Sequence, residues 1–415
     1  MVDVKPFPCI RPRIGMADQV AALPYDVFSV SEAQKEIAKH PHSFLRIDMT
    51  EATFPYPIDH NDDVVFEKAA ELLEEAVAEG IYITDDAPSY YIYRLISSEG
   101  RHQTGVVACS SIDDYLSGAI KKHENTRAEK EYNRIRHVDG LSAQTGPIFL
   151  TFRSQGDVEK VLERVVQEES LYHIHADDGV EHIVWRVDNP EDEAALCTAF
   201  ASTESLYIAD GHHRAASAVK AGILRRERAK SAGMTTQTLE SDYFLSVIFP
   251  SDQLSILDYN RVVSGLNGLS VKAFLEKVRE RFFITGPFDD PVKPLQKGHF
   301  GMYIEDVWYK LIVKGEFAPD DPVSGLDVSI LQDSILEPVL GIGDPRTDKR
   351  IDFIGGIRGS NELERRVSKD MTVAFLMYPT SIDELFSVAD AGLLMPPKST
   401  WFEPKIRSGI FIHRI

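Results

Sequence analysis

The sequence predicts an α+β protein in which mixed and antiparallel sheets combine with helices. Two β-rich runs, at 89–111 and 300–313, each contain a short polar turn and are typical of antiparallel hairpins. Residues 64–80 have helical periodicity instead, with Val65, Ala69, Leu72, Leu73 and Ala76 on one stripe. Strands and helices do not alternate strictly, which argues against a doubly wound parallel sheet.

The remaining elements follow in chain order. A helix-prone segment spans 113–137, and Gly80 ends the helix before it. The apolar run 206–210 predicts a short strand that leads directly into a helix-prone, Ala-rich segment at 211–221. The other predicted strands are 146–152, 182–187, 351–356, 373–379 and 408–413, and the other predicted helices are 362–367 and 381–392.

Length and charge limit the possible classes of protein. A chain of 415 residues is long enough for two domains, which we place at 1–250 and 251–415, with the second closing the site. The net charge of −20 repels nucleic acid backbones and anionic membranes, so neither is an expected partner. The three cysteines form no metal or disulfide pattern, and no signal peptide or membrane span is evident. We therefore expect a cytoplasmic protein.

The strongest functional motif is DGHHR at 210–214. It stands where a predicted strand ends and a predicted helix begins, and a helix N-terminus binds anions through unpaired N–H groups and its dipole. Gly211 permits close approach of a ligand, and Arg214 offers a planar fork to phosphate oxygens. His212 and His213 donate hydrogen bonds or move protons near neutral pH. Asp210 caps the helix or holds a divalent cation such as Mg²⁺.

Three further motifs are weaker on their own. His123 and Glu124 belong to HENT, within a stretch at 121–136 that has six Lys or Arg and three Glu in an acidic chain. That stretch is also typical of a solvated helix with ion pairs. The segment 395–409 contains Lys398 and Lys405, which are weaker candidates for anion contacts or residues of a C-terminal turn. The fourth motif is LPYDV at 23–27.

Together, LPYDV, HENT, DGHHR and PPKSTWFEPKIRSG at 396–409 occur in the order found in the family named domain of unknown function 1015. The chain resembles that family over essentially its whole length. The resemblance implies a fold and no particular reaction.

The DGHHR turn also resembles the phosphate-binding strand–turn–helix of the ParB/sulfiredoxin superfamily. Sulfiredoxins have a cysteine where this chain has His212, so their redox chemistry is not expected. ParB proteins bind DNA, which the charge disfavours. The nearest analogue is the archaeal free serine kinase branch, and this resemblance implies transfer of a phosphoryl group from a nucleotide to free L-serine with a Glu as base.

The leading hypothesis is therefore a small-molecule kinase with a nucleotide, ATP or ADP, as donor. Gly211, His212, His213 and Arg214 hold the donor phosphates, Glu124 accepts the hydroxyl proton, and His123 orients Glu124. Two alternatives remain. One is a nucleotide-binding regulator without turnover, and the other is a metal-dependent hydrolase that uses Asp210, His212 and His123.

Overall fold

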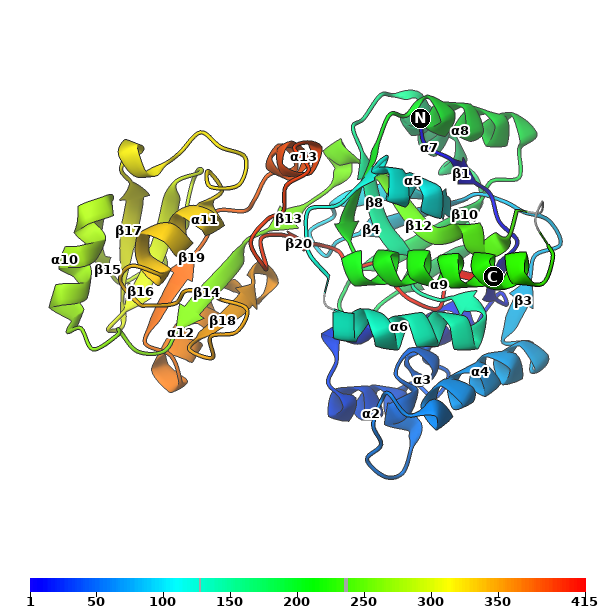
Figure 1. Ribbon diagram of the computed structural model, residues 1–415, viewed down its shortest axis with the longest axis horizontal. Coiled ribbons are helices and arrows are strands. Elements are labelled where there is room, and N and C mark those ends of the chain that lie inside the picture. The colour runs from blue at the N-terminus through cyan, green and yellow to red at the C-terminus, as the bar shows by residue number, and fades with distance from the viewer. Residues whose placement is uncertain (127, 235–237) are drawn as a thin grey trace. The chain divides into compact units, whose positions relative to one another are not determined.

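The computed structural model describes residues 1–126, 128–234 and 238–415. The chain forms two compact units. Unit 1 contains Met1–Leu254 and Pro404–Ile415, and unit 2 contains Ser255–Glu403. Figure 1 labels their helices and strands. None of the described helices is long and apolar enough to cross a bilayer.

The main sheet of unit 1 has nine strands. They are β1 (Val4–Lys5), β4 (Tyr91–Ile96), β5 (His102–Ser111), β6 (Ile120–Lys121), β8 (Ile148–Phe152), β9 (Tyr172–His175), β10 (Glu181–Arg186), β11 (Leu206–Asp210) and β12 (Tyr243–Pro250). Their order is β6-β11-β8-β12-β5-β4-β10-β9, with β1 beside β5. The pairs β6–β11 and β8–β12 are parallel and the others antiparallel, so the prediction of a mixed sheet is confirmed.

A second sheet of unit 1 brings the two ends of the chain together. Its strands are β2 (Cys9–Pro12), β3 (Tyr82–Thr84), β7 (Ala143–Gln144) and β21 (Ile412–Arg414), in the order β3-β2-β21-β7. Because β21 pairs with both β2 and β7, the segment Pro404–Ile415 belongs to unit 1. The two compact units differ from the predicted bounds 1–250 and 251–415, because residues 251–254 and 404–415 belong to unit 1.

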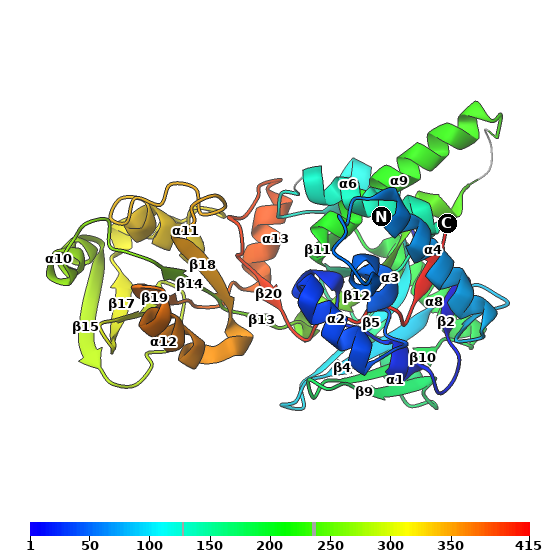
Figure 2. The same ribbon diagram turned by 90° about the horizontal axis from the view of Figure 1, so that it is seen from below.

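The α-helices of unit 1 include three that pack on one another in succession. The helices of this unit are α1 (Ala17–Val20), α2 (Val30–Lys39), α3 (Leu45–Asp48), α4 (Asp63–Ala78), α5 (Ile112–Ser117), α6 (Ala128–Leu141), α7 (Asp157–Val165), α8 (Pro190–Ser202) and α9 (His212–Ser231). Helix α9 buries Ala215, Ala218 and Val219 in the main core. Helix α6 packs on α9, and α4 packs on α6, as Figures 1 and 2 show. Small side chains let α9 approach closely, and a Cβ on Gly222 would lie 2.3 Å from the Ser241 carbonyl oxygen.

The predicted helix over 113–137 is wrong as a single element. Helix α5 ends at Ser117 because Gly118 adopts a left-handed conformation with φ of 83°. Strand β6 follows, and α6 begins only at Ala128. The HENT motif is therefore a connection between a strand and a helix, and its position depends on what β6 pairs with.

Unit 2 is built on a six-stranded antiparallel sheet. Its strands are β14 (Tyr259–Val263), β15 (Phe282–Phe288), β16 (His299–Ile304), β17 (Val307–Val313), β18 (Ile351–Gly355) and β19 (Val373–Leu376), in the order β15-β17-β16-β19-β14-β18. The predicted hairpin over 300–313 is confirmed as β16–β17. The remaining elements are α10 (Val271–Arg281), α11 (Asp327–Leu331), α12 (Gly359–Lys369), α13 (Ile382–Asp390) and the pair β13 (Ile256–Leu257) and β20 (Trp401–Phe402).

Candidate functional site

Two motifs that are distant in sequence meet at one edge of the main sheet. Strand β6 pairs with β11 in parallel, with Ile120 opposite Leu206 and Lys121 opposite Tyr207. Since parallel strands end at the same edge, the HENT motif that follows β6 lies beside the DGHHR motif that ends β11. The separate strands of the sheet therefore bring these motifs together.

The DGHHR motif stands at a strand-to-helix junction, as predicted. Strand β11 ends at Asp210 and α9 begins at His212, with Gly211 between them at φ of 93° and ψ of 32°. The N-cap residue is Gly211, which has no side chain to cap the helix, and the first-turn N–H groups of a helix can bind an anion. A Cβ on Gly211 would lie 3.0–3.1 Å from the guanidinium of Arg214, which folds back over this glycine. Gly211 thus provides both the left-handed turn and the space for Arg214.

The carboxylate of Asp210 is already engaged by two neighbours. Its Oδ1 accepts the N–H of Gly211 at 2.8 Å, and its Oδ2 pairs with Lys405 Nζ at 2.9 Å. Burial by itself would raise the pKa of Asp210, but Lys405 and Arg214 together hold it below the usual range. Asp210 therefore holds the turn and Lys405 in place, and it does not fit the expected role of a free Mg²⁺ ligand.

His212 is a neighbour of both Glu124 and His123. Nδ1 of His212 lies 3.7 Å from Glu124 Oε2, and Nε2 of His212 faces the backbone N–H of His123 at 3.5 Å. The two imidazole rings pack edge to face with centroids 4.5 Å apart. His212 is thus in position to orient Glu124, and the orientation of Glu124 by His123 stays a prediction.

Both inward-facing histidines are neutral at physiological pH. Burial lowers the pKa of His123 to about 4. Burial and the neighbouring His123 hold the pKa of His212 well below its usual value. A neutral His212 that accepts a hydrogen bond at Nε2 has its proton on Nδ1, which faces Glu124. The histidines therefore position the carboxylate, and the expected proton transfer by His212 near neutral pH is not favoured.

The guanidinium of Arg214 has N–H donors besides the one that binds the Pro147 carbonyl. Its Nη1 donates to the Pro147 carbonyl at 2.7 Å, which fixes the guanidinium. Within the described ranges of the chain, no other hydrogen bond and no carboxylate within ion-pair distance is found for Arg214. A Cβ on Gly146 would lie 3.4 Å from Ser408 Oγ and 3.6 Å from Arg214 Cδ, so the end of the chain lies beside this side chain.

A neighbouring cationic residue was not singled out from the sequence. The guanidinium of Arg134 lies 3.9 Å from the ring centroid of Tyr25, in the LPYDV motif, and 3.4 Å from Asp48 Oδ1. Arg134 and Arg214 line the same small cavity of about 20 Å³, which is room for about one water molecule. The excess of Lys and Arg at 121–136 was the only signal in the sequence for this residue.

The remaining predicted residues are His213, Lys398 and Lys405. His213 follows His212 in the first turn of α9 and is half-buried. Lys398 belongs to unit 2, where its Nζ lies 5.5 Å from the ring centroid of Tyr259. Lys405 belongs to unit 1, although both lysines come from one sequence motif. Phosphate binding by His213 and Lys398 stays a prediction.

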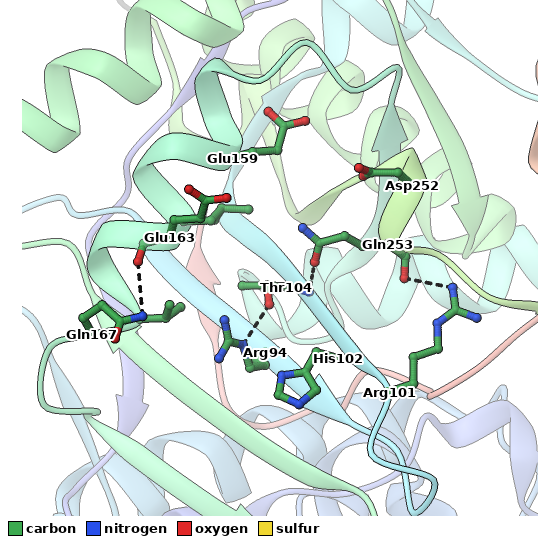
Figure 3. A pocket seen from close by; sticks show the side chains of 11 residues that line it. Arg94, Arg101, His102, Thr104, Glu159, Glu163, Gln167, Asp252 and Gln253 are labelled. Carbon is green, nitrogen blue, oxygen red and sulfur yellow. Dashed lines mark hydrogen bonds between the residues drawn. The ribbon is translucent and has the colours of Figure 1, made fainter.

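A larger cavity of about 400 Å³ lies elsewhere in unit 1, between α7 and the strands β4 and β5. Figure 3 shows Arg94 and His102 on one side and Glu159 and Glu163 on the other, with Arg94 donating to Thr104 Oγ1 at 2.9 Å. None of the predicted site residues lines this cavity. It is therefore distinct from the site at the N-terminus of α9.

Fold and site define an α+β protein of two units, whose first unit places a carboxylate, buried histidines and an arginine at a strand-to-helix junction. The chain belongs to the family described as "Protein of unknown function (DUF1015)", which matches residues 4–329. No curated protein matches the chain significantly.

The solved structures that the chain matches are distant. A free serine kinase in complex with AMP is 14% identical, with a TM-score of 0.34, over 74% of this chain and 91% of that chain. A mutant free serine kinase in complex with ADP is 14% identical, with a TM-score of 0.35, over 74% and 92%. SbnI with C-terminal truncation from Staphylococcus aureus is 11% identical, with a TM-score of 0.36, over 72% and 82%.

Proposed function

We propose that this protein is a nucleotide-dependent phosphotransferase that acts on a small hydroxylated metabolite, with free L-serine as the first candidate acceptor. The proposal depends on one observation, which is that Glu124 lies 3.7 Å from His212 in the first turn of α9, the turn that also carries Arg214. The distant kinases add no support at TM-scores near 0.35, so the proposal rests on the residues of this chain.

The donor phosphates bind at the first turn of α9. The N–H groups of this turn point along the axis of a 20-residue helix, whose dipole favours negative charge at this end. Arg214 adds a charge-assisted fork from Nε and Nη2, while Nη1 keeps its bond to the Pro147 carbonyl. ATP or ADP is the expected donor.

Glu124 is the proposed general base. Its side chain is 43% exposed, so a substrate hydroxyl can reach it, and His212 Nδ1 lies 3.7 Å from one of its oxygens. In the reaction, the hydroxyl proton passes to Glu124 and the hydroxyl oxygen forms a bond to the terminal phosphorus. The bond from phosphorus to the leaving nucleotide oxygen breaks. Arg214 and the helix N-terminus stabilise the charge that develops there.

Metal-dependent hydrolysis has less support from the geometry. Among the described residues, the three-residue group whose metal-ligating atoms lie within 4.8 Å of one another is His173, His175 and Glu181. Asp210 pairs with Lys405, and His212 faces His123 and Glu124. These contacts do not favour a hydrolase that binds a metal through Asp210, His212 and His123.

The test is direct detection of product. The purified protein is incubated with ATP or ADP and L-serine, with and without Mg²⁺, and phosphoserine is measured by mass spectrometry. A pool of other hydroxylated metabolites is run in parallel. Nucleotide binding in a thermal-shift assay without any phosphorylated product would reject the kinase and favour a nucleotide-binding regulator.

A further inference from the structure

We infer that His173, His175 and Glu181 form a binding site for a divalent transition-metal ion of the zinc class, on the outer edge of the main sheet. This site is separate from the N-terminus of α9, and it does not depend on the proposed phosphotransferase activity. Two imidazoles and one carboxylate are the donor types that such ions select.

The backbone places all three side chains on one face of the sheet. His173 and His175 alternate with Ile174 along β9, and Ile174 is buried while both histidines are exposed. Residues two apart on a strand project to the same side. Glu181 of β10 lies directly opposite His175 in the antiparallel register, so it projects to that side too.

The distances suit a small ion. Nε2 of His173 lies 2.7 Å from Glu181 Oε2, and the centroids of the two imidazole rings are 4.4 Å apart. One ligand atom from each residue lies within 4.8 Å of the others. Around a tetrahedral zinc ion with bonds of about 2.0–2.1 Å, ligand atoms are roughly 3.3 Å apart. Small side-chain rotations therefore bring the three atoms to bonding distance.

The hairpin holds these positions before an ion binds. Ala176 donates its N–H to the Val180 carbonyl at 3.0 Å, and Gly179 turns the chain with φ of 79°. Strand β10 is also paired with β4 on its other side. Because strand pairing fixes the backbone, the conformational entropy lost when the ion binds is small.

The site is open to solvent and leaves one coordination position for water. The side chain of His173 is 44% exposed and that of Glu181 is 38% exposed, so an ion reaches them directly. Three protein ligands with an open fourth position are typical of an exchangeable site. Hard ions such as Mg²⁺ prefer all-oxygen ligands, so they compete poorly for two imidazoles.

The experiment measures zinc bound to the full chain by equilibrium dialysis and elemental analysis, in the presence of excess Mg²⁺. We expect about one equivalent for the wild type and a rise in melting temperature with Zn²⁺. The double variant with His173→Ala and His175→Ala should bind none at this site. Glu181→Gln should weaken binding by about tenfold or more, since even residues that only support a metal ligand contribute that much.

His42→Ala is the matched control, because His42 is an exposed histidine outside the cluster, and this variant should retain the ion. Circular dichroism confirms that each variant is folded. If the double variant is misfolded, Glu181→Gln decides the question. The proposal is overturned if the wild type binds no zinc, if the folded double variant binds as much as the wild type, or if His42→Ala loses the same ion.

Discussion

The carboxylate of Glu124 lies 3.7 Å from Nδ1 of His212, although the two residues come from different strand-to-helix connections. In the proposed mechanism, Glu124 accepts the hydroxyl proton and the first turn of α9 binds the donor phosphates. Substitutions of Glu124 and of Arg214 should therefore affect nucleotide binding and turnover differently.

Glu124→Gln should retain nucleotide binding and lose turnover. The amide keeps the shape of the side chain but cannot accept the hydroxyl proton, so the rate should fall by about 10²–10⁴-fold. Binding is measured by thermal shift and turnover by product formation. Asn125→Ala, at the exposed neighbouring position, is the control and should keep activity. Wild-type activity in Glu124→Gln would remove Glu124 as the base.

Arg214→Ala should weaken nucleotide binding and turnover together. It removes a charge-assisted fork to phosphate, with an expected loss of about 2–4 kcal/mol in transition-state stabilisation. Nucleotide titration and kinetics measure the two effects. Arg228→Ala changes the same residue type at the other end of α9, where Arg228 pairs with Asp139, and should leave both unchanged. Equal losses in the two variants would contradict a specific role for Arg214.

Lys405→Met should destabilise unit 1 more than the double variant Asp210→Asn with Lys405→Met. The single variant leaves a largely buried carboxylate without its cation, whereas the double variant removes both charges. Because about a third of the Asp210 side chain is exposed, at 32%, we expect a penalty of roughly 1–3 kcal/mol. Urea unfolding measures it. Identical stabilities would indicate that the ion pair is fully screened.

The stability of unit 2 should decrease as the pH rises from about 4 to about 7. Burial raises the pKa of Asp327 to about 7, against the smaller opposing effect of the Gly298 N–H. The folded state therefore keeps a proton that the unfolded state releases near pH 4, so this contribution is complete below that pH and is lost through pH 7.

Asp327→Asn should flatten this dependence, because the amide oxygen still accepts the Gly298 N–H and carries no charge. Urea unfolding is followed by tryptophan fluorescence in a Trp185→Phe background, where the remaining Trp308 and Trp401 both belong to unit 2. Asp320→Asn, at an exposed position, should keep the wild-type slope. A flat wild-type profile would contradict the raised pKa.

The strand-to-helix junction at DGHHR could be predicted from the sequence because this region combines an apolar strand, a glycine and an Ala-rich helix within a few residues. The position of the motif at the junction followed from that local pattern. The ion pair between Asp210 and Lys405 could not be predicted from a local pattern. The two residues meet only because the end of the chain belongs to unit 1. The contact between His212 and His123 could not be predicted either, because it depends on the pairing of β6 with β11.

The sequence by itself determined the elements whose signal is local, namely the amphipathic helix α4, the hairpins β4–β5 and β16–β17, and the strand-to-helix turn at Gly211. Periodicity and glycine positions suffice there, because each depends on residues close in the chain. Only the tertiary structure decided that HENT lies beside DGHHR, that β21 belongs to unit 1, and that His212 is neutral. Strand pairing and burial depend on partners elsewhere in the chain, and these partners set both the neighbours and the protonation of a side chain.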